Sequence, residues 1–186
     1  MRLLMHICCA PCDIYPLKKL REKNFSIVGY FYNPNIHPYM EYKRREDTAR
    51  VFSDKSSLDV IFSEGYEMEF FLQRVAFDVQ GRCRYCYEMR LDSTARTAKA
   101  KGFDAFTTSL LYSRYQKHDM IREIALAVSE RHDIPFYYED FRVGWKEGVI
   151  GSREMGLYRQ QYCGCIYSEK ERYMKGFNPQ SIEQLF

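Results

Sequence analysis

The chain has 186 residues, of which 46% are hydrophobic and 28% charged, and its formal net charge is +3 at pH 7. This length supports one domain with a sizeable core, and no apolar run approaches the ~20 residues of a membrane span. The apolar start, Met1–Cys9, lacks the layout of a signal peptide, so a cytoplasmic protein without membrane contact is expected. The small positive charge permits an acidic partner but does not by itself indicate one.

Apolar runs typical of buried strands alternate with helical patterns along the chain. In chain order, the expected elements are a strand at 3–7, a helix from 10 to about 24, a strand at 25–32, a helix at 38–54, a strand at 60–62, a helix at 68–75, a helix at 82–101, a strand at 102–108, a helix at 115–131 and a strand at 134–138. This alternation predicts an α/β fold, a single domain over 1–186 with a Rossmann-like parallel sheet of about five strands and helices on both faces. The C-terminal segment from about 169 is expected to be peripheral.

The cysteines are the most informative feature of the sequence. Seven of them fall into three tight groups, namely Cys8, Cys9 and Cys12, then Cys83 and Cys86, then Cys163 and Cys165. An odd number without an export signal argues against disulfides, and this grouping favours metal ligation over scattered buried thiols. Because ligands bind at the carboxyl ends of parallel strands, the first two groups are expected to meet at one edge of the sheet. The alternation of strands and helices does not indicate where the third group lies in the fold.

Several chemistries suit such thiols. At helix starts the unpaired N–H groups are expected to lower the pKa of Cys12 and Cys83, which favours both metal binding and redox chemistry. A zinc ribbon needs two short knuckles, a thioredoxin-like site needs one pair, and an iron–sulfur cluster needs three or four thiolates. Seven thiols exceed one four-ligand site, which suits a cluster with a second metal or with extra redox thiols. Asp13, next to Cys12, is either a further ligand or a residue that complements the helix dipole.

Four motifs in this order resemble the QueH-type epoxyqueuosine reductases, and the resemblance runs from Leu3 to about Ser168. The motifs are His6-x-Cys8-Cys9-Ala10-Pro11-Cys12, Cys83-Arg84-Tyr85-Cys86-Tyr87, Thr107-Thr108-Ser109-Leu110-Leu111, and Arg159-Gln160-Gln161-Tyr162-Cys163-Gly164-Cys165-Ile166-Tyr167-Ser168. The family pattern has proline where this chain has Arg114, a departure that concerns the local turn. The resemblance implies an adenine-nucleotide-hydrolase-like, PP-loop-like α/β fold and the last step of queuosine synthesis on tRNA.

In that step the epoxide of epoxyqueuosine, at the wobble position of the anticodon, is reduced without cobalamin. The resemblance implies a [4Fe–4S] cluster with an additional mononuclear iron, and electrons from a ferredoxin- or flavodoxin-like donor. The hypothesis places the cluster on Cys12, Cys83 and Cys86, with Asp13 as a possible fourth ligand. Cys8 or Cys9 would then hold the single iron together with Cys163 and Cys165. No G-x-x-x-x-G-K-[ST] loop is present, so use of ATP is not expected.

Other residues are candidates for proton transfer and for contact with tRNA. The proton-donor candidates are His6, Tyr85, Tyr115 and His118, although the strand position of His6 also suits a buried core histidine. The candidates for substrate or tRNA contact are Arg84, Tyr87, Arg114 and Lys117. Two alternatives remain open: a zinc-stapled, non-catalytic module that binds tRNA or another nucleic acid, and a thiol–disulfide enzyme that uses a single cysteine pair.

Overall fold

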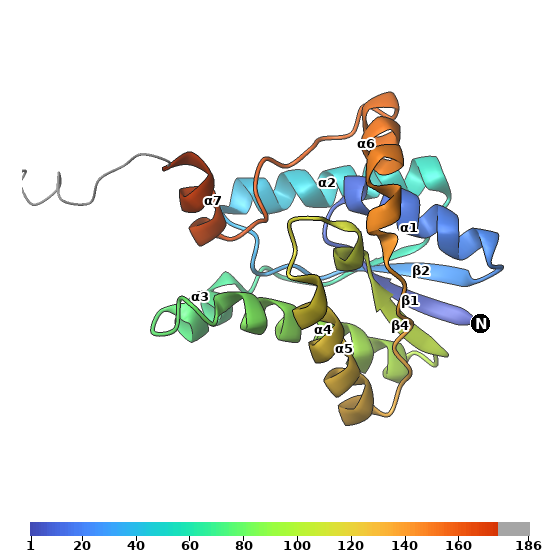
Figure 1. The fold of residues 1–186 in the computed structure, drawn as a ribbon, viewed down its shortest axis with the longest axis horizontal. Helices are drawn as coiled ribbons and strands as arrows, with labels where there is room; N and C mark the ends of the chain where they lie inside the picture. The colour runs from blue at the N-terminus through green and yellow to red at the C-terminus, as the bar shows by residue number, and fades with distance from the viewer. Residues whose placement is uncertain (175–186) are drawn as a thin grey trace, which may run out of the picture.

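A parallel sheet of four strands forms the centre of the computed structural model, which describes residues 1–174 (Figure 1). The strands are β1 (Arg2–His6), β2 (Ser26–Phe31), β3 (Val60–Phe62) and β4 (Ala105–Thr108), and they lie in the order β3-β2-β1-β4. The helices are α1 (Ala10–Glu22), α2 (Tyr39–Ser56), α3 (Met68–Val75), α4 (Arg82–Ala100), α5 (His118–His132), α6 (Trp145–Glu154) and α7 (Ile166–Tyr173), with short 3-10 turns at Ser109–Tyr112 and Phe141–Gly144. Of the segment expected to be peripheral from about 169, everything beyond 174 lies outside the described residues.

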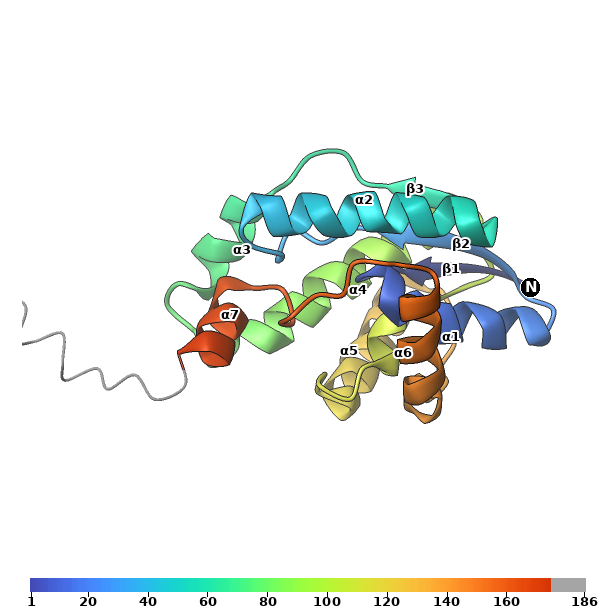
Figure 2. The ribbon, with the colours of Figure 1, turned by 90° about the horizontal axis from the view of Figure 1, so that it is seen from above.

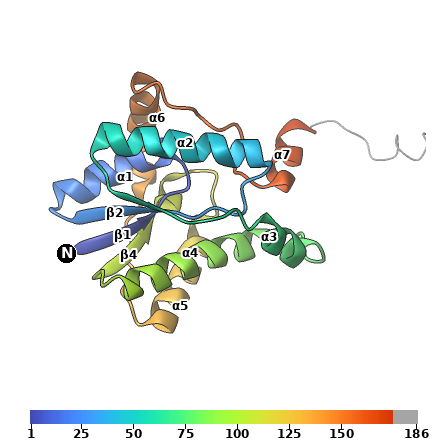
Figure 3. The ribbon, with the colours of Figure 1, turned by 180° about the vertical axis from the view of Figure 1, so that it is seen from behind.

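The two faces of the sheet carry different helices. Helices α1, α2 and α6 cover one face, and α4 and α5 cover the other (Figures 1 and 3). The short helices α3 and α7 lie beyond the carboxyl ends of the strands, away from the N-terminus (Figure 2). This arrangement confirms the predicted α/β class. None of the helices within residues 1–174 combines the length and the apolar character that crossing a membrane requires.

The central strand β1 is buried on both sides. Leu3, Leu4 and Met5 are fully buried, as expected for a parallel strand between two helical layers. Met5 lies opposite Gly29 in β2, where a Cβ would come within 2.4 Å of the Ile7 side chain. Glycine at this position therefore allows the segment that follows β1 to pack closely on β2.

The strand order creates a crevice at the carboxyl end of β1. The chain moves outward from β1 to β2 and β3, then returns across the sheet to place β4 on the other side of β1. Ligands of open α/β sheets bind at such a reversal point. Cysteines follow β1 at this point, and the segment from Ser109 to Gln116 follows β4.

The expected strand at 134–138 is wrong in its extent. The segment forms a single bridge between Phe106 and Phe136, held by bonds from Phe106 N to the Pro135 oxygen (3.0 Å) and from Tyr137 N to the Phe106 oxygen (2.8 Å). Proline has no N–H to donate, which limits the ladder that this segment can form. The expected helix at 115–131 begins later, at His118, because a 3-10 turn at Ser109–Tyr112 and a further turn at 114–116 precede it.

Candidate metal centre and adjoining pocket

Three thiols converge where β1 passes into α1. Cys9 is the extended residue before the helix, and Pro11 occupies the first helical turn, where its missing N–H is tolerated. The Cys9 Sγ lies 3.7 Å from the Cys8 Sγ and 2.7 Å from the Cys12 Sγ. The three sulfur atoms all lie within 4.8 Å of one another, and all three residues are buried. We call Cys8, Cys9 and Cys12 the thiol triad.

A carboxylate lies beside the thiol triad. Asp13 is fully buried, and neither of its oxygens has a hydrogen-bond partner. Burial and the charge of the Cys8 thiolate raise the pKa of this carboxyl well above its usual range. A buried carboxylate without partners is costly, and a bound cation would remove that cost. Three thiols and a carboxylate also form a donor set that suits zinc or iron, so these residues fit a metal.

Hydrogen bonds within the thiol triad shift the pKa values of its members in opposite directions. Bonds from Cys12 and Cys9 lower the pKa of Cys8 well below its usual range, whereas bonding with Cys8 and Cys9 raises the pKa of Cys12. The expected lowering at Cys12 is therefore wrong for the metal-free chain, because its thiol neighbours outweigh the helix start. Ser109 also lies beside Cys8, with its Oγ 3.6 Å from the sulfur and 3.3 Å from the backbone nitrogen.

The other four cysteines lie around the first turn of α4. Cys86 and Cys165 are buried and pack in one apolar cluster with Phe71 and Val75. Cys83 is half-buried, and Cys163 is exposed. Within residues 1–174, no group of three potential ligands that includes any of these four thiols is as compact as the thiol triad. The Cys12 sulfur lies with those of Cys8 and Cys9, and the hypothesis that groups Cys12 with Cys83 and Cys86 on the cluster stays a prediction.

Residues 157–165, here called the strap, contain Cys163 and Cys165 and contribute residues 159–163 to the lining of the site. Arg45 of α2 donates to the carbonyl oxygens of Cys163 (2.9 Å) and Tyr162 (3.1 Å), and Glu41 neutralises it at 2.7 Å. His37 N also donates to the Gly164 oxygen at 2.8 Å. A buried ion pair therefore fixes the backbone at the third cysteine group.

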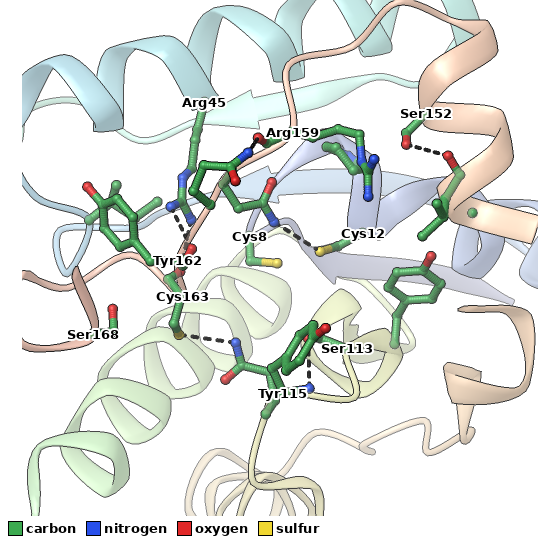
Figure 4. Close-up of a pocket in the computed structure, with 18 of the residues that line it drawn as sticks. Cys8, Cys12, Arg45, Ser113, Tyr115, Ser152, Arg159, Tyr162, Cys163 and Ser168 are labelled. Atoms are coloured by element: carbon green, nitrogen blue, oxygen red, sulfur yellow. Dashed lines mark hydrogen bonds between the residues drawn. The ribbon is translucent and has the colours of Figure 1, made fainter. Parts of the chain in front are cut away.

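The strap closes one side of a pocket of about 520 Å³ (Figure 4). Cys8 and Cys12 line it together with Cys163 from a distant part of the chain, so thiols of the first and third groups share one cavity. The further lining residues include two sets of side chains. The aromatic set is Tyr112, Tyr115 and Trp145, and the polar set is Arg45, Arg90, Ser113, Gln116, Arg159, Gln160, Gln161 and Tyr162.

Of the four proton-donor candidates, only Tyr115 lines the pocket among the described residues. His6 is buried with its ring nitrogens bonded to Thr108 Oγ1 (3.1 Å) and the Tyr32 oxygen (3.2 Å), and burial lowers its pKa to about 3. Tyr85 stacks on Phe71 with ring centroids 6.1 Å apart. His118 bonds to the Tyr138 hydroxyl at 3.1 Å, outside the pocket lining.

The predicted substrate-contact residues are placed differently from one another. Arg114 and Lys117 are exposed in the segment before α5, and Arg114 lies 5.9 Å from the Trp145 ring at the pocket wall. Tyr87 is buried, and its hydroxyl bonds to Gln116 (2.7 Å) and to the Lys117 nitrogen (3.2 Å). Arg84 is exposed, is not among the pocket-lining residues, and pairs with Glu123 at 2.7 Å on the surface.

Several donors to the sulfur atoms were missed by reasoning from the sequence. Gln160 Nε2 lies 2.7 Å from the Cys9 sulfur, Gln116 Nε2 lies 3.2 Å from the Cys163 sulfur, and Arg90 Nη2 lies 3.1 Å from the Cys86 sulfur. The i, i+4 spacing of Cys86 and Arg90 on one helix was a signal for the last contact. The two glutamine contacts join distant segments, so no local pattern indicates them.

Comparisons with known proteins agree with this picture. The family model "Epoxyqueuosine reductase QueH" matches residues 3–171. A protein of that name from Dehalococcoides mccartyi is 39% identical over 96% of this chain and 98% of its own length. Another, from Thermotoga maritima, is 34% identical over 93% of each chain.

One solved structure shows the same fold at low sequence identity. The predicted subunit of a tRNA methyltransferase from Methanocaldococcus jannaschii superposes with a TM-score of 0.54 and 13% identity, over 83% of this chain and 75% of its own. At that identity the match supports the α/β fold alone. The family model and the curated relatives carry the assignment: this chain is an oxidoreductase that belongs to the QueH family of epoxyqueuosine reductases.

Proposed function

We propose that the chain reduces the epoxide of epoxyqueuosine in the anticodon wobble position of tRNA to give queuosine. Both C–O bonds of the epoxide break, the oxygen leaves as water, and two electrons and two protons are consumed as a C=C bond forms. The observation that carries the proposal is the thiol triad, which opens into a pocket at the sheet reversal. The names of the curated relatives support the reaction.

The proposed cofactors are a [4Fe–4S] cluster and an additional iron, without cobalamin or ATP. The thiol triad with Asp13 would hold one metal centre, and the thiols around the start of α4 would hold the other. When bound, such centres supply electrons one at a time and a Lewis acid for the epoxide oxygen. Buried donor sets of this kind support the assignment, because Asp13 otherwise lacks any partner.

The chain's own residues bind the modified nucleoside and limit the access of water. The aromatic set offers apolar surface for the base and the cyclopentane ring, and residues 159–163 of the strap line the pocket together with Cys8 and Cys12. Arg114 and Lys117 are exposed in the segment that contributes Ser113, Tyr115 and Gln116 to the pocket lining, and there they would meet phosphates of the anticodon loop. A ferredoxin- or flavodoxin-like protein remains the proposed electron donor, and cytoplasmic tRNA the proposed substrate.

The proposal is tested on protein purified without oxygen. We expect a brown protein with acid-labile sulfide, and with about five irons per chain, one more than a four-iron cluster supplies. With dithionite it should convert epoxyqueuosine in tRNA to queuosine, seen as the loss of one oxygen by mass spectrometry. A colourless protein that holds only zinc after iron–sulfur reconstitution, and that binds tRNA without turnover, would instead establish a zinc-stapled binding module.

Tyr115 is expected to contact a base of the anticodon loop. Its side chain is 84% exposed and stands edge-on to the ring of Trp145, with centroids 5.5 Å apart. Because a stacked base is worth roughly 1–3 kcal/mol, Tyr115→Ala should raise KM about tenfold, whereas Tyr115→Phe should stay close to wild type. Trp145 is the only tryptophan, so its fluorescence reports binding of the RNA even in metal-free protein.

The control for this variant is Phe77→Ala, which removes a fully exposed aromatic ring outside the pocket and should leave KM unchanged. An unchanged KM in Tyr115→Ala would contradict the stacking role, whereas a fall in kcat for Tyr115→Phe would assign the hydroxyl a part in the chemical step.

A further inference from the structure

Arg90 of α4 is a buried cation without a carboxylate partner. Its side chain is only 2% exposed. The Nε atom donates to the Cys86 carbonyl oxygen at 3.0 Å, and Nη2 donates to the Cys86 sulfur at 3.1 Å. No carboxylate among residues 1–174 pairs with Arg90, whereas the equally buried Arg45 pairs with Glu41.

An isolated charge in a protein interior is destabilising by many kcal/mol unless an opposite charge accompanies it. Among residues 1–174, the only acidic side chain that Arg90 contacts by a hydrogen bond is the thiol of Cys86. The guanidinium also lines the same pocket as Cys8 and Cys163. Glu171 lines the same pocket but pairs with Arg82, so thiolate sulfur is the anion that can compensate the charge of Arg90.

We propose that Arg90 is the counter-cation of the thiolate-bound metal centre and that it eases the centre's reduction. This inference rests on the proposed function and deepens it. Cysteine ligands bring negative charge to a centre, and each added electron brings more, so a fixed positive charge nearby stabilises the reduced form. Charge and hydrogen bonds to the sulfur atoms are the means by which proteins tune such potentials. Arg90 acts through the Cys86 sulfur and is a positioning residue.

The test measures reduction of the iron-loaded protein by spectroelectrochemical titration. Arg90→Met preserves much of the side-chain length but removes the charge, and Arg90→Lys keeps the charge. In R90M we expect unchanged iron and sulfide content and at least a tenfold fall in the equilibrium constant for one-electron reduction, which corresponds to 59 mV. R90K should stay within threefold of the wild type. Arg131→Met is the matched control, because it removes a half-exposed arginine paired with Glu88 and Asp92, and its potential should not move.

If R90M does not fold, the pair R90Q and R90K answers the same question, because only lysine keeps the charge. Equal potentials in that pair, or a wild-type potential in iron-loaded R90M, would overturn the role of Arg90 while leaving the proposed function intact. A wild-type protein without any redox-active iron would overturn the proposed cofactors, and this inference with them.

Discussion

Replacement of Cys9 by alanine is expected to remove reduction of epoxyqueuosine while leaving the protein folded. The Cys9 sulfur lies between the sulfurs of Cys8 and Cys12, at 3.7 and 2.7 Å. Without it the thiol triad becomes a pair, and a metal there loses a ligand. Changes to residues that only support a ligand cost about 10–100-fold in affinity or activity, so loss of the ligand itself should exceed ~100-fold in kcat/KM. Iron content should fall in parallel.

The measurement needs a control for the disturbance of a buried core. Val128→Ala removes two methyl groups from a fully buried side chain of α5, outside the pocket lining. It should destabilise the fold by about 0.5–3 kcal/mol, as core truncations commonly do, yet keep its iron and its turnover below the unfolding temperature. Full iron and full turnover in Cys9→Ala would exclude Cys9 as a ligand.

The fold and part of this site are predictable because they depend on local patterns. Apolar runs such as Leu3–Met5 indicate buried strands, and the alternation with helices dictates a parallel sheet. From that alone, the cysteines after β1 and those at the start of α4 are expected at one edge. The strand at 134–138 fails for a local reason too, since Pro135 cannot donate to a ladder.

The arrangement of thiols within the site is not predictable in this way. Cys12 bonds with Cys9 because the first turn of α1 brings residues three apart together, whereas Cys86 packs with Cys165. The path of the strap depends on side chains of α2 more than a hundred residues earlier. Neither the spacing nor the composition of the sequence indicates such long-range contacts. The proposed role of Arg90 as a counter-cation can be inferred only once its burial is known.

Glu41→Ala is expected to have two effects: it should destabilise the fold, and it should weaken the contacts that hold the backbone at the third cysteine group. Glu41 is 8% exposed and accepts from Arg45 at 2.7 Å and from the Tyr158 hydroxyl at 2.7 Å. Its removal leaves the Arg45 guanidinium buried and uncompensated, which typically costs about 3–5 kcal/mol. For a chain of this length, that loss lowers Tm by roughly 6–20 °C. Thermal unfolding of metal-free protein measures it directly.

A double variant separates stability from positioning. Glu41→Leu with Arg45→Met replaces the buried pair with apolar side chains, which is often neutral for stability, so Tm should recover. The carbonyl oxygens of Cys163 and Tyr162 nevertheless lose their donors, so iron content and turnover should stay low. Asp47→Ala on the same helix breaks an exposed pair with Lys43 and should change neither property. If the double variant binds iron fully, the strap is held by its other contacts, such as the bond from His37 N to the Gly164 oxygen, and the ion pair serves stability alone.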